Sequence, residues 1–182
     1  MSNYEQLLRI TSYLFKFCSR LKAGNPKKKA LKYWVKIAQK EYFSVELDFL
    51  QSSANITNNI PPLVSSLNLF LDLMGIIRSR RRISKCLYFD FDVHNPILLP
   101  KEHRFTSLLI KHCHLKIQHL GTGTTVNYLR EQGFWIPRGR SAVKTELSSC
   151  NICRKYTAFK LKIEHSTMVV RKTLQHNSPN LL

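Results

Sequence analysis

The sequence predicts a mainly α-helical protein with a small irregular β element in its middle, and three observations predict it. Apolar residues recur at helical spacing in two N-terminal segments, about residues 4–22 and 27–51. Residues 67–99 lose that period and are rich in β-branched and aromatic residues. A helical pattern returns after Lys101 in several short segments. We therefore expect N-terminal helices, a short mixed element and then a bundle of three or four helices.

The two N-terminal helices are separated by a break at Gly24, Asn25 and Pro26. Pro26 suits the start of the second helix, because the N–H that proline lacks would have no partner in a first turn. The amphipathic first helix is expected to pack on a core rather than on a membrane. The Ser/Asn-rich residues 52–59, followed by two prolines, indicate a loop.

The middle segment is expected to hold two or three short strands. Polar and apolar residues alternate from Tyr88 to Val93, as in a strand with one exposed face. Its two aspartates resemble a metal-binding pair, but the same alternation explains them as exposed strand residues. Pro96 and Pro100 bracket the tripeptide Ile-Leu-Leu, which should be a short strand or extended segment.

Turn-forming residues divide the segment after Lys101 into short helices. Its glycines should end two of them, and a threonine of the run GTGTT (121–125) is expected to cap the second helix. FWIPRGR (134–140) indicates a turn into a third helix over about residues 141–149. A last short helix should begin near Cys150.

The chain is strongly basic. It has 29 Lys and Arg against 11 Asp and Glu, a net charge of +18 and a pI near 10.0. A polyanionic partner would relieve the self-repulsion, so nucleic acid is the expected partner class and an anionic membrane the second. Phosphate contacts would give an affinity that falls with salt. The candidate nucleic-acid-binding residues are Arg138, Arg140, Lys144, Arg154 and Lys155. Further clusters at Lys27–Lys29 and Arg78–Arg82 could serve as nuclear-import signals or as solvated faces.

Membrane-spanning and secreted proteins are not favoured. The most apolar run, residues 60–77, is interrupted by prolines and polar residues. The N-terminus lacks the basic region and the small-residue cleavage site of a signal peptide. The five cysteines of a chain that is not secreted suggest metal or thiol chemistry rather than a disulfide framework.

Two short motifs carry the candidate chemistry. Residues 111–119 (KHCHLKIQH) hold three histidines and a cysteine, and Cys150 and Cys153 form a CxxC pair. A redox CxxC follows a strand in a βαβ context, whereas the surroundings here look helical. Two imidazoles and two thiolates suit structural Zn²⁺, and with four protein ligands the ion has no open position for catalysis. We therefore expect one structural Zn²⁺ per chain.

The first histidine ligand is open between His112 and His114. In a continuous helix, at about 100° per residue, His112 and His119 would share a face, and His114 would lie about 140° from His119. If the chain turns just before His119, that residue can instead fold back onto His114. The expected ligands are His114, His119, Cys150 and Cys153, with His112 as the alternative first ligand.

The order His-x4-His-x30-Cys-x2-Cys resembles the HHCC zinc-binding domain of retroviral and LTR-retrotransposon integrases. HLGTGTTVNYLREQGFWIP looks like the family stretch with a glycine after the second histidine, a threonine-led helix and an aromatic-Trp-x-Pro turn. NPILLPKEHRFTSLLIKHCH and WIPRGRSAVKTELSSCNICRKY resemble Pao/BEL-type polyproteins, where the His-x4-His spacing is usual and favours His114. LDLMGIIRSRRRISK is similar too, although Ser79–Arg81 replace glycines. The resemblance implies a zinc-stabilised three- or four-helix HHCC bundle.

The resemblance further implies a non-catalytic integrase module that binds DNA, as element ends or non-specific duplex, and helps integrase subunits associate. Integrases join DNA with a carboxylate triad in a core that follows the CxxC, whereas residues 154–182 contain Glu164 as their single acid. Upstream, Asp48 and Asp72 are expected to lack partners. We expect a fragment or truncated element without enzymatic activity, acting in the nucleus after import, alone or with full-length integrase. A host DNA-binding or chromatin adaptor and a protein–protein interaction module are the alternatives.

The expected organisation has four parts. They are a helical N-terminal region over 1–60 that resembles a polyprotein connection segment, a mixed connector over 61–100, an HHCC domain over 101–160 and a tail over 161–182.

Overall fold

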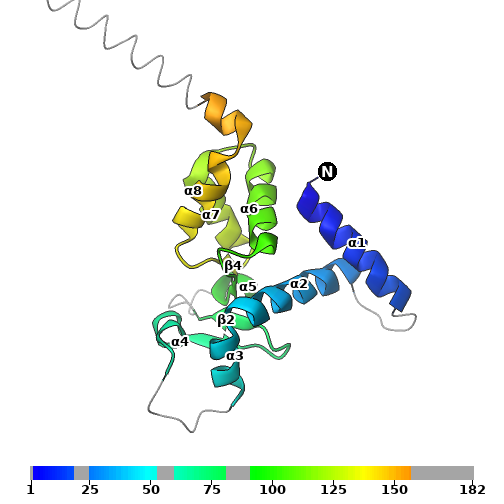
Figure 1. The fold of residues 1–182 in the computed structure, drawn as a ribbon, viewed down its shortest axis with the longest axis vertical. Coiled ribbons are helices and arrows are strands. Elements are labelled where there is room, and N and C mark those ends of the chain that lie inside the picture. The colour runs from blue at the N-terminus through cyan, green and yellow to red at the C-terminus, as the bar shows by residue number, and fades with distance from the viewer. Residues whose placement is uncertain (1, 19–24, 53–59, 81–90, 157–182) are drawn as a thin grey trace, which may run out of the picture.

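The computed structural model describes residues 2–18, 25–52, 60–80 and 91–156 (Figure 1). Its helices are α1 (Asn3–Cys18), α2 (Pro26–Tyr42), α3 (Ser44–Gln51), α4 (Pro62–Leu67), α5 (Phe91–His94), α6 (Arg104–Lys116), α7 (Gly121–Glu131) and α8 (Gly139–Ser148), with a further helical segment at residues 151–156. One small sheet accompanies them, so the predicted mainly α fold class is confirmed. Within the described residues, no helix is long and apolar enough to cross a membrane.

The second N-terminal helix starts as predicted but ends earlier. The Asn25 side chain accepts a hydrogen bond from the Lys27 amide at 3.0 Å, and Pro26 occupies the first turn. Instead of one helix to residue 51 there are two, because Phe43 leaves the helical region with φ −126° and ψ 37°. The Phe43 side chain is buried in a small core with Leu69 and Leu98, and this burial compensates for the break.

The sheet joins the middle of the chain to its C-terminal helices. Its strands are β1 (Leu69–Leu71), β2 (Ile77–Ser79), β3 (Ile97–Leu98) and β4 (Phe134–Trp135), in that spatial order. The first three pair antiparallel, and β3 pairs parallel to β4 with Ile97 opposite Phe134. The predicted Ile-Leu-Leu strand is confirmed as β3. The FWIPRGR stretch was predicted as a turn only, and β4 corrects that prediction.

The predicted strand over residues 88–93 is wrong in its described part. Residues 81–90 lie outside the described residues, and Phe91–His94 form α5 instead of continuing a strand. Asp92 and its neighbours are held there by Arg78, whose guanidinium reaches Asp92 Oδ1 at 2.8 Å and the Asn95 carbonyl at 2.8 Å. Tertiary ion pairing therefore overrides the local alternation.

Arg78 and Asp72 also correct two expectations about charge. Arg78 is buried and its Nε lies 2.8 Å from Asp72 Oδ2, so its charge is neutralised inside the fold and unavailable to phosphate. Asp72, expected to lack a partner, accepts hydrogen bonds from Arg78 and from the amides of Met74 and Ile76. Burial alone would raise the pKa of Asp72, but these hydrogen bonds and the Arg78 charge outweigh it and lower the pKa.

A single core runs from α1 to α8. Tyr4 of α1 and Val35 of α2 belong to the same buried cluster as Phe105 of α6, Leu129 of α7 and Val143 of α8. Both α1 and α2 contact α6, and Figure 1 shows α6, α7 and α8 standing together above the sheet. The helix that carries the His motif, α6, is therefore packed from outside by the N-terminal helices.

Candidate metal centre

The first half of the site is the end of α6 and the turn that follows it. His114 lies in the last turn of α6 and is buried, with 3% of its surface exposed. Gln118 and His119 then adopt left-handed backbone conformations, with φ of 52° and 63°. The His119 amide donates to the His114 carbonyl at 3.1 Å. Of the two arrangements that the sequence left open, the structure shows the turn before His119, which folds His119 back onto His114.

The glycines after His119 have a different role from the one predicted. They do not end α6, which has already ended at Lys116; Gly121, with φ of 89°, begins α7. Leu120 precedes α7 with no side-chain cap, so the predicted threonine cap is wrong. Thr124 and Thr125 instead donate their hydroxyls to the carbonyls of Leu120 and Gly121. Gly133, with φ of 77°, follows the end of α7 as predicted.

The second half of the site follows α8. The Cys150 amide donates to the Leu147 carbonyl at 2.9 Å, and the Arg154 amide donates to the Cys150 carbonyl at 3.0 Å. These bonds start the helical segment at residues 151–156, as predicted. Because one helical turn separates Cys150 from Cys153, both sulfur atoms face the same side.

The structure brings His114, His119, Cys150 and Cys153 together. One donor atom from each lies within 4.8 Å of the others. The closest pairs are His119 Nδ1 to His114 Nε2 at 2.8 Å, His114 Nε2 to Cys153 Sγ at 3.1 Å and Cys150 Sγ to His119 Nδ1 at 3.3 Å. Around a tetrahedral Zn²⁺ with bonds of about 2.0–2.3 Å, ligand atoms lie roughly 3.3–3.8 Å apart. The donor set therefore fits a structural zinc ion. Two of the closest pairs are shorter than this spacing, so these donor atoms would move slightly apart around a bound ion.

His112 lies elsewhere. Its Nδ1 is 2.8 Å from Ser2 Oγ, and its ring stacks on Tyr4 with centroids 4.8 Å apart. The next two residues of α6 have different surroundings. Cys113 is buried in the core, and this burial raises the pKa of its thiol to about 12. His114 belongs to the cluster. His112 therefore contacts α1, whereas His114 lies in the cluster, next to His119 and Cys153.

The electrostatics of the cluster favour a bound cation. Burial, and then the nearby charge of His119, lower the pKa of His114 and keep its imidazole neutral, the form that binds metals. Burial, and then the hydrogen bond and charge of Cys150, raise the pKa of Cys153. Two thiolates this close repel each other unless a cation lies between them, and a divalent metal supplies that charge.

Thr125 is a further residue of the site that sequence reasoning did not identify as functional. Its side chain is fully buried on α7, and its Oγ1 lies 3.4 Å from His114 Nδ1. Because the Thr125 hydroxyl donates to the Gly121 carbonyl at 2.7 Å, its oxygen is free to accept from His114 Nδ1–H. That hydrogen bond selects the tautomer in which His114 Nε2 faces the cluster with its lone pair. No spacing rule in the sequence connects these two residues.

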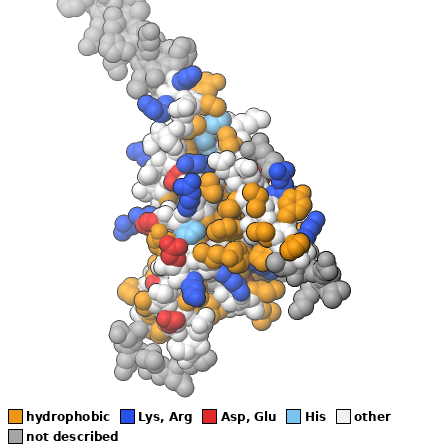
Figure 2. Space-filling model, turned by 45° about the vertical axis from the view of Figure 1, so that its right-hand side comes forward, with side chains coloured by type: hydrophobic (Ala, Val, Ile, Leu, Met, Phe, Trp, Pro, Cys, Tyr) orange, Lys and Arg blue, Asp and Glu red, His pale blue; other side chains and the backbone are white. Residues whose placement is uncertain are grey.

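The candidate nucleic-acid-binding residues are all exposed. Arg138 precedes α8, Arg140 and Lys144 lie on it one turn apart, and Arg154 and Lys155 lie in the last helical segment. Figure 2 shows Lys and Arg side chains spread around an area of hydrophobic ones rather than gathered in one patch.

Two aromatic residues of the C-terminal half, Tyr156 and Trp135, differ in exposure. Tyr156 is 72% exposed. Trp135 is half-buried, with the Arg130 guanidinium 5.0 Å from its ring centre. Tyr156 therefore offers its ring to solvent, whereas Trp135 packs in the fold.

Comparison with known proteins gives one match. No curated protein and no solved structure matches the chain significantly. Residues 101–158 match the integrase zinc binding domain family, and the matched segment contains the complete His114, His119, Cys150 and Cys153 cluster.

Proposed function

We propose that this chain is a non-catalytic, zinc-binding module of a retrotransposon integrase of the Pao/BEL type. The observation that carries the proposal is the convergence of four donor atoms inside a segment that matches the integrase zinc binding domain. His114 Nε2, His119 Nδ1, Cys150 Sγ and Cys153 Sγ would hold one Zn²⁺. The ion would cross-link the end of α6 to the segment after α8 and would do no chemistry on a substrate.

Metal content tests the first part of the proposal. Protein purified without chelator should contain one zinc per chain by mass spectrometry, and cobalt substitution should give the absorption of a site with two thiolates. Because metal binding and folding are coupled, chelation should unfold the α6–α8 bundle. A metal-free protein with an unchanged helical spectrum would sink the zinc assignment.

Nucleic-acid binding is the second part of the proposal. Five exposed cations surround the zinc module, and the net charge of the chain is +18. Contacts from these side chains to phosphates would bind DNA, as element ends or non-specific duplex, with little choice of sequence. The module would also associate with itself or with full-length integrase, and it would act in the nucleus.

Salt dependence tests the second part. The affinity for duplex DNA should fall linearly on a log–log plot against salt. Substituting Arg138, Arg140 and Lys144 by alanine should reduce the slope by roughly one unit for each phosphate that the variant no longer binds. Lys36, Lys40 and Arg9, exposed cations of α1 and α2, provide a control triple variant of equal charge. Equal reductions in both triple variants would mean that net charge, not the module, governs binding.

A protein–protein interaction module is a second candidate, favoured by one observation. The outer face of α1 exposes Ile10, Tyr13, Leu14 and Phe17, at helical spacing and between 53% and 83% accessible. A chain that binds no DNA at any salt concentration but associates with itself or another protein through this face would support the second candidate over the first. A host adaptor with the same module would differ by lacking a catalytic core encoded next to it.

A further inference from the structure

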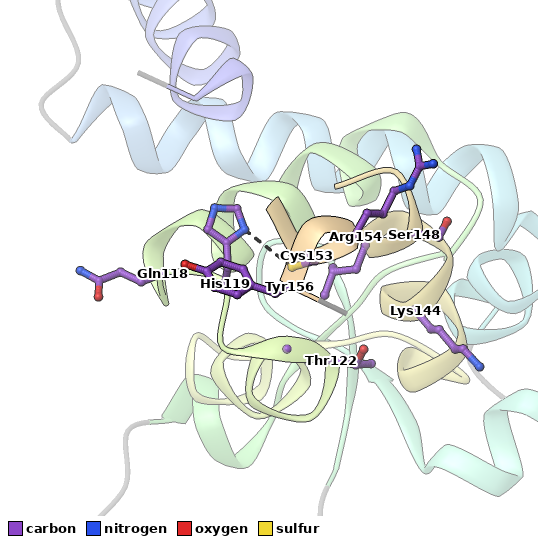
Figure 3. Close-up of a pocket in the computed structure, with 10 residues that line it drawn as sticks. Gln118, His119, Thr122, Lys144, Ser148, Cys153, Arg154 and Tyr156 are labelled. Atoms are coloured by element: carbon purple, nitrogen blue, oxygen red, sulfur yellow. Dashed lines mark hydrogen bonds between the residues drawn. The ribbon is translucent and has the colours of Figure 1, made fainter. Parts of the chain in front are cut away.

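An open cavity of about 850 Å³ lies beside the His/Cys cluster (Figure 3). Its walls come from the turn between α6 and α7, from α8 and from the helical segment at 151–156, and His119 and Cys153 form part of it. The volume lies within the range of ligand sites, roughly 300–1,000 Å³. The cavity depends on the zinc module, because the turn at His119 and the segment after Cys150, which both line it, meet at the cluster.

Two cations line this cavity. Lys144 of α8 and Arg154 after it are both exposed, and Figure 3 shows them on the same side, with Gln118 on the other. None of the lining residues is acidic, and within the described part of the chain neither cation has an acidic partner. Glu146, two residues from Lys144, is bound to Lys111 at 3.2 Å. The cavity therefore has an uncompensated positive potential that attracts an anion.

An aromatic ring and an apolar side chain complete the lining. Tyr156 is 72% exposed although it borders the cavity, and Leu147 of α8 is buried at its wall. A tyrosine with its ring open to solvent offers a flat surface on which a planar ligand can stack. The lining thus combines one aromatic face, one apolar side chain and two cations.

This combination of side chains is suited to binding a single nucleotide. The base of a nucleotide stacks on aromatic side chains, and its phosphates are bound by Lys and Arg nearby. A base inside a duplex is paired and stacked on its neighbours, so only an unpaired base can enter a cavity and reach a tyrosine ring. The chemistry of the cavity therefore favours single-stranded over double-stranded nucleic acid.

We propose that this cavity binds an unpaired nucleotide of a nucleic-acid strand, with Tyr156 stacking on the base and Lys144 and Arg154 contacting the adjacent phosphates. The proposal rests on the zinc-binding function above, because the cavity needs the folded module. It goes further by assigning a site and by predicting that the module distinguishes single-stranded from double-stranded DNA. In α8, Lys144 then has a role that Arg140, one turn earlier and not part of the cavity lining, does not share.

Binding of the zinc-loaded full chain to a labelled single strand, and to a duplex with the same sequence, tests the proposal. Tyr156→Ala should weaken single-strand binding about tenfold or more and leave duplex binding within about twofold, since the base no longer stacks on a ring. Tyr156→Phe should retain the affinity. Lys144→Ala and Arg154→Ala should each weaken single-strand binding and reduce its salt dependence by about one phosphate contact.

Matched controls separate the site from general charge and aromaticity. Tyr13→Ala removes another exposed tyrosine and Lys36→Ala another exposed lysine, and neither should change the preference for single strands. Zinc content and the helical spectrum, measured for every variant, should equal those of the wild type. If Tyr156→Ala weakens single-strand and duplex binding equally, or changes neither of them, the proposed nucleotide site is wrong. The zinc module and its binding to duplex DNA are not contradicted by that result. Absence of zinc would instead overturn the proposed function itself.

Discussion

His114 Nε2 and His119 Nδ1 lie 2.8 Å apart, with their rings edge to face, although a helix end separates the two residues. Two successive left-handed residues, Gln118 and His119, make this approach possible. Neither is a glycine, and each such conformation costs of order 1 kcal/mol for an L-residue. A metal ion bound by both rings would offset that cost. The strained backbone and the four donor atoms therefore both indicate a metal site at this place.

The orientation of α6 predicts different effects for its two histidines. His114→Ala should abolish stoichiometric zinc and unfold the α6–α8 bundle, because a structural site loses one of four ligands. His112→Ala should keep one zinc per chain and destabilise the protein by about 1–2 kcal/mol, because its interactions with Ser2 and Tyr4 are removed. Metal content and urea unfolding measure both effects. Loss of zinc from His112→Ala alone would reverse the ligand assignment.

Thr125 should tune zinc affinity through His114. Thr125→Val keeps the shape of the side chain but removes the oxygen that faces His114 Nδ1, and it should lower zinc affinity about 10–100-fold. Thr125→Ser should retain most of the affinity. Thr124→Val removes a neighbouring hydroxyl that bonds only to the Leu120 carbonyl among the described contacts, and serves as the control. Competition with a chromophoric chelator gives the affinities, and equal values for the two valine variants would refute the role of Thr125.

Gln39 of α2 should be important for stability, because its side chain bonds to two strands of the sheet. Its buried amide donates to the carbonyls of Ile77 and Leu98 and accepts from the Ile77 amide, all within 2.9 Å. Gln39→Leu leaves three buried backbone groups without partners and should reduce the free energy of unfolding by about 3 kcal/mol or more. Urea denaturation measures the reduction. Lys40→Ala, next to it but exposed, should change stability by less than about 0.5 kcal/mol.

Asp72 should make stability depend on acid pH. Because its pKa in the folded state is lowered from 3.8, the Asp72–Arg78 interaction stabilises the fold fully above that value. The contribution is lost as the pH falls through the lower, folded-state pKa. The difference in unfolding free energy between wild type and Asp72→Asn should therefore be largest near neutral pH and shrink below about pH 4. Zinc release in acid affects both proteins and cancels in the difference.

A control variant shows whether this pH dependence is specific to Asp72. Asp48→Asn removes an exposed carboxylate of α3 and serves as the control for the loss of one negative charge. A constant difference for Asp72→Asn would mean that its ion pair with Arg78 does not stabilise the fold.

The sequence by itself determined the fold class and the metal-binding motif. Helical periodicity predicted α1 and α2, and the CxxC spacing placed two sulfur atoms one turn apart. These features are local, since each depends on residues within about one or two turns of one another. That is why pattern and spacing could reveal them.

Only the tertiary structure decided the rest, because it depends on contacts between residues far apart in the chain. The residues around His112 and His114 left the first ligand open, and only the family resemblance favoured His114. In the structure, His112 stacks on Tyr4 of α1, and His114 lies in the cluster. Strand β4 has only two residues, too few to show the alternation of polar and apolar residues that predicts a strand. It forms through its pairing with β3. Asp92 lies in α5 where local alternation predicted a strand, because the buried Arg78 charge requires carboxylates around it. Long-range burial and charge pairing therefore prevailed wherever the local preference was weak.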